Sequence, residues 1–447
     1  MLIDQHLPEH NIEVEITGLT ARGEGLGRHN GLAVFVPGAL PGETVRVLFE
    51  QKKKNYARAT LLEIIQQSAE RVAPACPVCD VCGGCALQHL DYATQLHWKR
   101  QWLADALRRI GGLQVEVLPT IGAKQMTGYR DRVQLHSVWR DGALKLGFYG
   151  RGSRELTDDV PCLLMRHLLV QLTRTLRELL PHRAEHLTAL QHVALRCDSS
   201  GGQAMLTLVG VEDKEELCQL ATWLIEQEPR LVSVWANWGK TVYGIYGDHW
   251  RKLAGLERLP DSLDDLSLQI SPGAFTQIHA AQARRLYGCV AHYAALSGTE
   301  TVLDAYSGVG IIALYLAAKA QALIGVEEYT PAVTDARRNA KLNGITNCRF
   351  VAGRVEEALP HLLTEGLQIQ VAVLDPPRGG CAPAALKTLT ELKPQRIIYV
   401  SCDPATLARD ARLLTEFGYT VCQVQPLDMF PHTGHVEAVA LLERKDM

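Results

Sequence analysis

From about residue 273 to the C-terminus, short apolar runs with the length of β-strands alternate regularly with segments of helical periodicity. Two of these runs are Val371–Leu374 and Ile397–Val400. Such alternation is typical of a parallel, doubly wound α/β sheet with helices on both faces. In an open sheet of this kind, ligands bind just outside the carboxyl ends of the strands. The residues that directly follow the predicted strands are therefore the first candidates for a functional site.

A short motif follows each of these two runs. Asp375-Pro-Pro-Arg378 follows the first, and Ser401-Cys402-Asp403-Pro404 follows the second. A cysteine after a strand is more often a small core residue. Cys402 lies at the end of a strand where ligands bind, however, and is therefore a candidate nucleophile. The Asp-Pro-Pro motif is ambiguous alone, because amino-methyltransferases usually follow it with an aromatic residue and here Arg378 takes that place.

A glycine-rich turn, Asp304-Ala-Tyr-Ser-Gly308-Val-Gly310, follows another predicted strand and opens an apolar helix. Glycines there let a ligand approach the backbone, and a helix N-terminus favours a carboxylate or a phosphate. About 20 residues further on, Glu327 ends the next strand, where a carboxylate accepts hydrogen bonds from ribose hydroxyls. The third glycine of a dinucleotide fingerprint is missing. The turn therefore indicates S-adenosylmethionine.

The polar segment between Leu427 and Glu437 supplies a candidate base. Glu437 lies between His435 and an apolar run, where partial burial would raise the carboxyl pKa toward the working range of a general base. His432 and His435 are alternative bases. A thiolate that adds to C6 of a pyrimidine makes C5 able to attack a methyl donor, and a base must then remove the C5 proton. These residues together indicate methylation of a pyrimidine at C5.

Four of the twelve cysteines crowd into ten residues, as Cys76-x2-Cys79-x2-Cys82-x2-Cys85. This spacing suits either zinc or an iron–sulfur cluster. Two zinc knuckles normally lie farther apart, so one zinc ion on all four thiolates would be cramped. Ferredoxin-type clusters take a final ligand from remote sequence beside a proline, and Pro161-Cys162 fits that position. The spacing required by a radical S-adenosylmethionine site, C-x3-C-x2-C, is absent.

The first 65 residues have the pattern of a small β-barrel. Strand-like runs at 11–16, 32–36 and 43–49 are separated by glycine turns, which favours a barrel over an open sheet. The segment Thr17–Gly27 resembles a TRAM domain, an RNA-binding barrel. The net charge of the whole chain is −3. Residues 41–160, however, hold 17 Lys and Arg against 13 Asp and Glu, with Lys52, Lys53 and Lys54 forming one basic cluster.

The length and hydropathy of the chain indicate how many domains to expect and whether a segment spans a membrane. At 447 residues the chain is expected to form three domains at about 150 residues each. We predict a TRAM-like, OB-like barrel at 8–66, a central α+β domain with the iron–sulfur site at 67–270, and a Rossmann-like domain at 271–447. No apolar run approaches the roughly 18 residues of a membrane span. The N-terminus lacks the basic flank and apolar stretch of a secretory signal, so we expect a cytoplasmic protein.

Taken together, these motifs resemble the RNA uracil-5-methyltransferases, in the class with a TRAM domain and an iron–sulfur cluster. The resemblance covers nearly the whole chain. Its specific parts are Cys76-x5-Cys-Gly-Gly-Cys85, Phe275-Thr-Gln277, Asp304-Ala-Tyr-Ser-Gly308, Asp375-Pro-Pro-Arg378, Val400-Ser-Cys-Asp-Pro404 and Phe430-Pro-His-Thr-Gly-His-Val-Glu437. Because several independent motifs occur in one order, a chance likeness is remote.

The resemblance implies a role for each candidate residue. Cys402 is the nucleophile and Glu437 the base. Contacts to S-adenosylmethionine come from Gln277, Tyr306, Glu327 and Asp375. The cluster, of the [4Fe-4S] type, is held by Cys76, Cys82, Cys85 and Cys162, which leaves Cys79 free. The sequence departs from the family pattern at His279, Ile311 and Arg354, so the adenine contacts are less defined than the ribose contacts.

The expected partner is a structured RNA, bound by a monomer. The target uracil must leave its base stack to reach Cys402, and Phe275 is a candidate for stacking on the displaced base. Particular uridines of 23S ribosomal RNA are the favoured target, and a uridine of tRNA is the alternative. Two further hypotheses are an RNA cytosine-5 methyltransferase, which normally carries Pro-Cys or Thr-Cys at the nucleophile, and a non-catalytic RNA-binding or redox protein.

Overall fold

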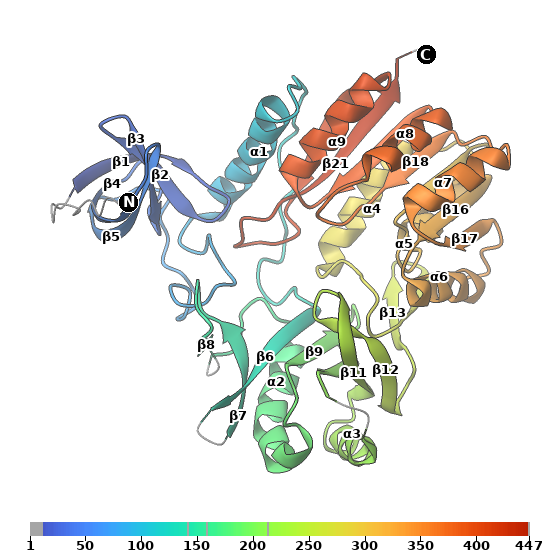
Figure 1. Cartoon of the computed structure of the whole chain (residues 1–447), viewed down its shortest axis with the longest axis horizontal. Coiled ribbons are helices and arrows are strands. Elements are labelled where there is room, and N and C mark those ends of the chain that lie inside the picture. The colour runs from blue at the N-terminus through green and yellow to red at the C-terminus, as the bar shows by residue number, and fades with distance from the viewer. Residues whose placement is uncertain (1–11, 141–142, 158–159, 212–213, 446–447) are drawn as a thin grey trace, which may run out of the picture.

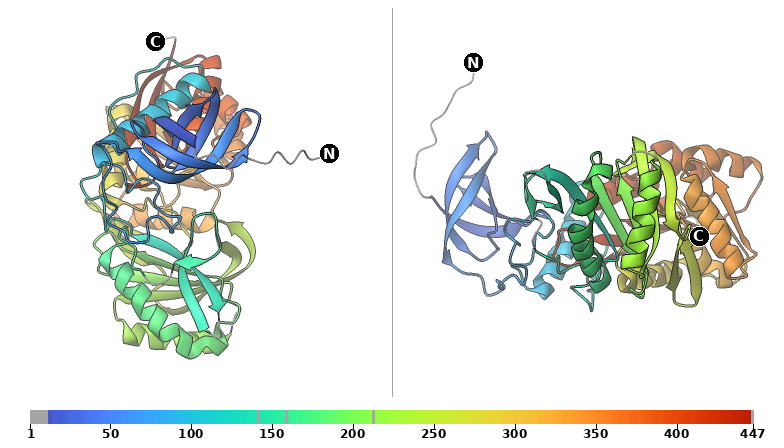
Figure 2. Two further views of the ribbon diagram at one scale, coloured as in Figure 1. Left: turned by 90° about the vertical axis from the view of Figure 1, so that its left-hand side faces the viewer. Right: turned by 90° about the horizontal axis from the view of Figure 1, so that it is seen from below.

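The computed structural model has three parts, a small barrel, a central domain and a larger C-terminal domain (Figures 1 and 2). It describes residues 12–140, 143–157, 160–211 and 214–445. The barrel projects from one side of the molecule, and the central and C-terminal domains lie against each other. Within these residues, no helix is both long and apolar enough to cross a bilayer.

The N-terminal part is a closed five-stranded barrel, as the sequence predicts. Its strands are β1 (Ile12–Leu19), β2 (Glu24–His29), β3 (Leu32–Pro37), β4 (Thr44–Lys52) and β5 (Tyr56–Gln66). They are ordered β1-β2-β3-β5-β4, and β1 closes the barrel on β4. Alternate residues such as Val14, Val34 and Val45 fill the interior, because successive side chains of a strand point to opposite faces.

The central domain is an α+β unit built on a seven-stranded sheet. Its elements are β6 (Arg132–Arg140), β7 (Ala143–Tyr149), β8 (Leu156–Thr157), α2 (His167–Leu179), η1 (Leu180–His186), β9 (His192–Cys197), β10 (Ala204–Val209), α3 (Glu215–Gln227), β11 (Leu231–Tyr243) and β12 (Tyr246–Gly255). The strand order is β12-β11-β10-β9-β6-β7-β8. Helices α2 and α3 bury one face of the sheet through a leucine-rich core.

The C-terminal domain opens with a hairpin, continues as a strand–helix alternation and ends in two paired strands. The first half contains β13 (Leu259–Leu263), β14 (Leu266–Ile270), α4 (Ala280–Ala294), β15 (Thr301–Ala305), α5 (Ile311–Leu316), η2 (Ala317–Lys319), β16 (Ala322–Glu327) and α6 (Thr330–Leu342). The second half contains β17 (Cys348–Ala352), α7 (Val355–Thr364), β18 (Val371–Leu374), α8 (Pro383–Glu391), β19 (Arg396–Ser401), α9 (Pro404–Glu416), β20 (Tyr419–Leu427) and β21 (Glu437–Arg444). Two cores lie on opposite faces of the sheet, one with α4, α5 and α6 and the other with α7, α8 and α9.

The sheet of this domain has the order β17-β16-β15-β18-β19-β21-β20. The first five strands are parallel, as predicted. The expectation of a wholly parallel sheet is wrong for β21, which runs antiparallel to both of its neighbours, β19 and β20. The connection from β20 to β21 is the loop 428–436 without a crossover helix, and a parallel neighbour requires such a crossover.

Helix α1 (Tyr92–Arg109) precedes the central sheet in sequence but packs on the C-terminal domain. Leu103 and Leu107 join the core that contains α9. Helical periodicity from Leu96 to Ile110 predicts one apolar face formed by Trp98, Trp102, Leu103, Leu107 and Ile110. This is wrong at Ile110, which is 47% exposed. The buried residues of the helix are Gln95, Lys99, Leu103 and Leu107.

Candidate active site

The candidate residues meet at one edge of the C-terminal sheet. Strands β16, β15, β18 and β19 are neighbours and run parallel, so the residues after each strand lie at the same carboxyl edge. The glycine turn follows β15, Glu327 ends β16, Asp375 follows β18 and Cys402 follows β19. The antiparallel strand β21 brings Glu437 to this edge as well, because Ala438 pairs with Ser401.

Cys402 is half-buried between the end of β19 and the start of α9. Burial raises the pKa of its thiol to about 11, and the negative charges of Glu437 and Asp375 act in the same direction. The positive charge of the Arg378 guanidinium opposes this rise. The next residue, Asp403, caps α9 by accepting a hydrogen bond from the Thr406 N–H at 2.9 Å. The cysteine is therefore fixed by a strand on one side and a capped helix on the other.

Glu437 is the first residue of β21 and is almost completely buried. Burial raises the pKa of its carboxyl well above the usual range, and Asp375 adds to the rise while Arg378 opposes it. A carboxyl group with a raised pKa accepts a proton readily, as a general base requires. The arrangement sets Glu437 in electrostatic contact with Cys402.

Arg378 connects the groups around Cys402, which the sequence motif alone did not indicate. Its Nη2 lies 3.4 Å from both ring nitrogens of His435. Burial, and then the charge of Arg378, lower the pKa of His435, which favours the neutral imidazole at this position. The only sequence signal for this role was that Arg378 follows the Asp-Pro-Pro motif at a strand end.

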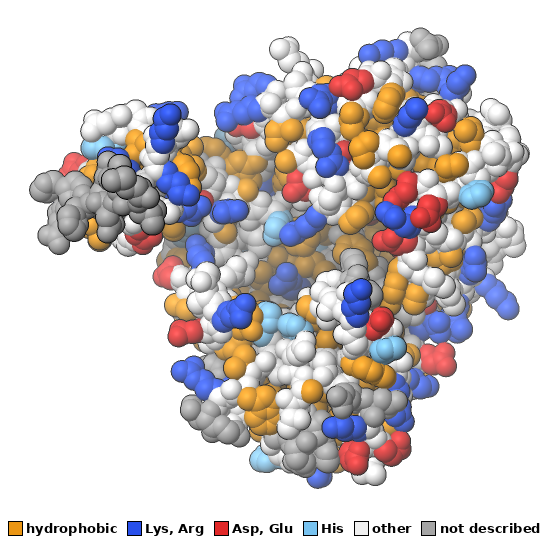
Figure 3. Space-filling model, in the orientation of Figure 1, with side chains coloured by type: hydrophobic (Ala, Val, Ile, Leu, Met, Phe, Trp, Pro, Cys, Tyr) orange, Lys and Arg blue, Asp and Glu red, His pale blue; other side chains and the backbone are white. Residues whose placement is uncertain are grey.

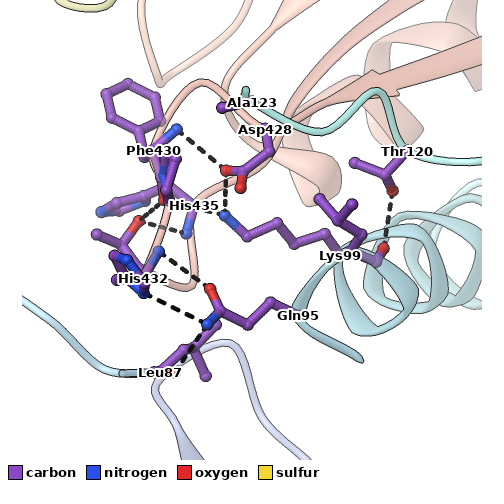
Figure 4. A network of polar contacts seen from close by, with 12 residues as sticks. Leu87, Gln95, Lys99, Thr120, Ala123, Asp428, Phe430, His432 and His435 are labelled. Carbon is purple, nitrogen blue, oxygen red and sulfur yellow. Dashed lines mark hydrogen bonds and ion pairs between the residues drawn. The ribbon is translucent and has the colours of Figure 1, made fainter. Parts of the chain in front are cut away.

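His432, one of the alternative bases, is occupied elsewhere. Its N–H donates to Gln95 Oε1 at 3.0 Å, and its Nδ1 lies 3.4 Å from Gln95 Nε2 (Figure 4). Its carbonyl oxygen accepts hydrogen bonds from the N–H groups of Ala86 and Leu87, both at 3.0 Å. The ring of His432 is thus directed toward α1, whereas Glu437 and His435 face the Cys402 side.

The turn after β15 offers backbone to a ligand. Tyr306 has a φ of 66°, and Gly308 and Gly310 also have positive φ. The ring of Tyr306 packs against the C-terminal core, and its hydroxyl hydrogen-bonds Cys381. What Tyr306 presents at the strand edge is therefore its backbone. At Gly310, a Cβ atom would lie 2.9 Å from the side chains of Ala336 and Phe350, so glycine allows the turn to lie close against α6 and β17.

Carboxyl groups surround this turn. Glu327 accepts hydrogen bonds from the N–H groups of Gly308 at 3.0 Å and Tyr329 at 2.8 Å. Asp304 is fully buried, and one of its oxygens accepts from the Ala313 N–H at 3.0 Å while the other has no partner. Burial first, and then Asp375, raise the pKa of Asp304 to about 8. Burial raises the pKa of Asp375 to about 7.

The loop 271–279, between β14 and α4, carries the C-terminal domain's contacts with the central domain. Gln277 is buried in this loop, and Phe275 beside it is 47% exposed. The carbonyl oxygen of Ala274 accepts a hydrogen bond from Arg196 Nη2 of the central domain at 2.6 Å. The ring of His279 stacks on Tyr129 with 4.6 Å between centroids. His279, a departure from the family pattern, thus contributes to the contact between domains.

The other two departures lie at helix starts. Ile311 is the first residue of α5 and is partly buried against the core. Arg354 is the N-cap residue of α7, and its guanidinium pairs with Glu356 of the same helix. The side chain of Arg354 is largely exposed.

A buried ion pair underlies the loop 428–436 (Figure 4). Lys99 Nζ of α1 lies 2.5 Å from Asp428 Oδ1, and neither side chain is accessible to solvent. Lys99 also donates to the carbonyl oxygen of Phe430 at 3.0 Å, and Asp428 accepts from the Tyr92 hydroxyl at 2.8 Å. That these two residues pair could not be inferred from the sequence, because they are 329 positions apart.

The five cysteines of interest line one cavity of about 50 Å³. Cys76, Cys79, Cys82 and Cys85 come from the cysteine segment, residues 76–85, and Cys162 comes from the turn before α2. Cys79 and Cys85 are buried and the other three are half-buried. Within the described part of the chain, no group of three or more His, Cys, Asp and Glu side chains is arranged to hold a metal ion. Cys162, remote in sequence, thus lies beside the cysteine segment. The described side chains are not arranged around the position of one metal ion.

Comparison with known proteins places the chain in a family. The family described as tRNA (Uracil-5-)-methyltransferase matches residues 257–445, and the TRAM domain matches residues 10–62. A protein named as an uncharacterized RNA methyltransferase of Halalkalibacterium halodurans is 40% identical over 97% of this chain and 97% of its own. The chain belongs to the RNA uracil-5-methyltransferase family. The enzyme is also 39% identical to an uncharacterized RNA methyltransferase of Caldanaerobacter subterraneus subsp. tengcongensis, over 97% of this chain and 98% of that protein.

A solved structure supports the same assignment for the methyltransferase. It is the crystal structure of Pyrococcus abyssi tRNA (uracil-54, C5)-methyltransferase in complex with S-adenosyl-L-homocysteine. The two are similar with a TM-score of 0.74 and 28% sequence identity, over 96% of this chain and all of the other. The enzyme is thus an S-adenosylmethionine-dependent RNA methyltransferase, and the resemblance drawn from the motifs is confirmed.

Proposed function

We propose that this enzyme methylates C5 of a uracil in structured RNA through a covalent bond from Cys402, with Glu437 as the base. The observation that carries the proposal is the convergence of Cys402, Arg378 and Glu437 at the carboxyl edge of the sheet. A nucleophile, a cation that favours its ionised form and a buried carboxyl group are the parts that this chemistry needs.

The steps follow from the positions of these groups. The Cys402 thiolate adds to C6 of the uracil, and the electrons of the C5–C6 double bond move onto O4. C5 then takes up the methyl group that S-adenosylmethionine supplies. Glu437 removes the C5 proton, the double bond re-forms, and the thiolate leaves C6. Arg378 lowers the pKa of the thiol against the effect of burial, so it favours the thiolate at the start and at the end of the cycle.

The turn after β15 fits S-adenosylmethionine. When bound, this molecule supplies a methyl group on a positively charged sulfur. Three carboxyl groups, those of Asp304, Glu327 and Asp375, gather at this turn, and a cationic ligand beside them would favour their ionised forms against the effect of burial. We propose that Glu327 binds the ribose and that Gln277, Asp375 and the backbone of Tyr306 provide the other contacts. Phe275, exposed on the adjoining loop, is placed to stack on the displaced uracil.

A suicide substrate tests this mechanism. RNA that contains 5-fluorouridine, together with S-adenosylmethionine, should form a stable covalent adduct, because fluorine cannot leave as a proton does. Cys402→Ala should form no adduct on a denaturing gel, and Cys422→Ala, which replaces an exposed cysteine, should form it normally. An undiminished adduct with Cys402→Ala would overturn the assignment of the nucleophile.

We further propose that Cys76, Cys82, Cys85 and Cys162 hold a [4Fe-4S] cluster. A tetrahedral zinc site would need its sulfur atoms about 3.8 Å apart, given Zn–S bonds of about 2.3 Å, and the described cysteines form no such group. Their shared cavity brings the remote Cys162 beside the segment, as a ferredoxin-type set of ligands requires. Protein purified without oxygen should be brown with about four iron atoms per chain. Cys79→Ser should keep the iron and Cys82→Ser should lose it, and stoichiometric zinc without iron would contradict the proposal.

The RNA target has two candidates. The combination of TRAM barrel and cysteine segment favours 23S ribosomal RNA, and the likeness to a tRNA methyltransferase of known structure favours tRNA. The face of the molecule in Figure 3 is hollowed between the domains, with Lys and Arg side chains around the hollow, as a polyanionic substrate requires. Digestion of both RNA classes from a deletion strain should reveal which 5-methyluridine is missing, and loss from tRNA alone would exclude the ribosomal target.

A further inference from the structure

The segment that holds the cysteines also touches the active-site loop, residues 428–436. Ala86 and Leu87, which directly follow Cys85, both donate their N–H groups to the carbonyl oxygen of His432 at 3.0 Å. The carbonyl oxygen of Cys85 accepts a hydrogen bond from Arg151 at 3.0 Å. Only one peptide unit therefore separates a proposed cluster ligand from the first of two hydrogen bonds to the loop.

Gln95 of α1 completes the contact from the other side. Its side chain is fully buried. It accepts from the His432 N–H at 3.0 Å and donates to the carbonyl oxygens of Leu87 at 3.0 Å and Leu90 at 2.8 Å (Figure 4). Gln95 thus hydrogen-bonds the residues that follow the cysteine segment and also the loop 428–436. We call Ala86, Leu87 and Gln95 the His432 clamp.

The clamp holds the loop in a conformation that is not relaxed. His432 has a φ of 68°, a left-handed value that is unfavourable for a residue other than glycine. The barrel packs against the same place, since a Cβ atom on Gly434 would lie 1.5 Å from the carbonyl oxygen of Ala21. A Cβ atom on Gly23 would likewise lie 2.3 Å from the carbonyl oxygen of Ala86. Backbone of the barrel, the cysteine segment and the loop is therefore in direct contact.

The far end of the loop reaches the reacting groups. His435, three residues after His432, lies beside Arg378, whose positive charge acts on the Cys402 thiol. Glu437 follows two residues later at the start of β21. A shift of His432 would be carried along this short stretch to His435 and to the approach to Cys402.

We propose that the cysteine segment positions the active-site loop through the His432 clamp, so that a filled cysteine site is required for a correctly placed loop. Ala86, Leu87 and Gln95 are positioning residues, because they act through His432 and touch no reacting atom. The inference deepens the proposed function and rests on it for the cluster and for the roles of Cys402 and Glu437. It gives the cluster a structural role in catalysis that requires no electron transfer.

Hydrogen exchange of single amides tests the clamp without relying on methylation. Gln95→Met removes the acceptor of the His432 N–H, so this amide should exchange at least about tenfold faster. The Phe430 N–H, which donates to Asp428 at 3.1 Å, should change much less. Gln101→Met, a partly exposed glutamine on the same helix that bonds only Asp105 among described residues, should leave both amides unchanged. Equal protection of His432 in Gln95→Met and in the unaltered enzyme would overturn the clamp.

Loss of the cluster tests the link to the cysteines. Cys85→Ser should lose its iron, and the amides of Ala86, Leu87 and His432 should then exchange faster together, while those of β15 and β18 stay protected. If Cys85→Ser does not fold, the iron is stripped from the folded enzyme with an oxidant and a chelator and the same amides are followed. Unchanged exchange at these amides after iron loss would overturn the link. Absence of iron from the anaerobic enzyme would contradict the proposed cluster, and the Gln95→Met result would then decide the clamp alone.

Kinetics separate positioning from a general loss of structure. Gln95→Met should lower kcat while the KM for S-adenosylmethionine stays within about twofold, because the turn after β15 does not touch the clamp. Gln101→Met should keep both values. A Gln95→Met enzyme with unaltered kcat, despite faster exchange at His432, would overturn the positioning role.

Discussion

Two adjoining regions of the C-terminal domain are held in place by different kinds of contact. The strand-end centre, Cys402, Arg378, Asp375 and Glu437, consists of residues that follow or begin strands of one sheet. The loop 428–436 is held instead by side chains of α1 and by the chain that leaves the cysteine segment. The first region takes its geometry from a regular ladder of backbone hydrogen bonds. The second depends on a few buried polar side chains from remote sequence.

The difference predicts how each region responds to mutation. In the strand-end centre, a side chain can be exchanged while the sheet still places its neighbours, so chemistry should change more than stability. In the loop, a buried polar partner cannot be removed without leaving another group unsatisfied, so stability and position should change together.

The largest effect on stability is expected from the buried ion pair under the loop. Lys99→Met leaves Asp428 charged, buried and without its partner, which should lower the free energy of unfolding by about 3–5 kcal/mol. Lys99→Met with Asp428→Asn should recover part of this loss. Urea unfolding followed by the fluorescence of Trp98 and Trp102, which lie on the same helix, measures both variants.

An exposed ion pair of the same domain is the matched control. Arg349 and Glu365 pair at 2.7 Å with both side chains largely in solvent, and Arg349→Met should leave the unfolding transition where it is. If Lys99→Met were as mild as Arg349→Met, the distinction between the two regions would fail.

A smaller effect is expected on the reactivity of Cys402. Because burial raises its pKa to about 11, the thiolate fraction and the rate of alkylation should rise about tenfold per pH unit through the neutral range. Arg378→Met removes the cation that opposes this rise, so alkylation near neutral pH should slow. Glu437→Gln should speed it at pH values where the Glu437 carboxyl is ionised, because the substitution then removes a negative charge beside the thiol. Peptide mass spectrometry follows the peptide that contains Cys402.

Cys422 serves as the internal control in the same digest. It is exposed and lies on β20, so its alkylation should be equal in all variants. A faster Cys402 in Arg378→Met would show that the guanidinium does not favour the thiolate, and the centre would then need another activating group.

The smallest effect is expected in the barrel, far from the chemistry. Lys52, Lys53 and Lys54 are exposed at the end of β4 and in the turn after it. Neutralising all three should weaken RNA binding and flatten its dependence on salt by up to about one unit per lost phosphate contact. Neutralising Lys319, Lys341 and Lys387, exposed on the C-terminal domain, tests whether the position or the number of charges matters. Equal salt slopes for the two triple variants would remove the barrel from the RNA-binding surface.

The sequence predicted the regular parts of the fold well, because their signals are local. Alternation of apolar residues fixes the barrel strands, and strand–helix alternation fixes the parallel part of the sheet. The strand β21 was expected, but its antiparallel direction was missed, since the direction of a strand depends on whether a helix crosses back before it. The location of α1 was also not evident, because its amphipathic pattern does not say which sheet it covers.

In the site, too, the residues with local sequence signals could be predicted and those placed by remote contacts could not. Cys402, Asp375 and Glu327 follow predicted strands, so their meeting at one edge could be inferred from topology alone. Cys162 was found only through its proline and the family resemblance. Lys99, Gln95 and the direction of the Tyr306 ring could not be predicted, because each depends on contacts between segments far apart in the chain. A polar residue at a helix position that the apolar pattern assigns to the core is the one signal that could have marked Gln95 and Lys99.

The most direct measurement of the central claim uses Glu437→Gln with unmodified RNA. Without the base, the thiolate can still add to C6 and C5 can still be methylated, but the C5 proton stays and Cys402 cannot leave. A covalent, methylated protein–RNA adduct should therefore accumulate on a denaturing gel in Glu437→Gln, depend on S-adenosylmethionine, and be absent in Glu437→Gln with Cys402→Ala. Normal turnover of Glu437→Gln without an adduct would contradict the account and would make His435 the next candidate for the base.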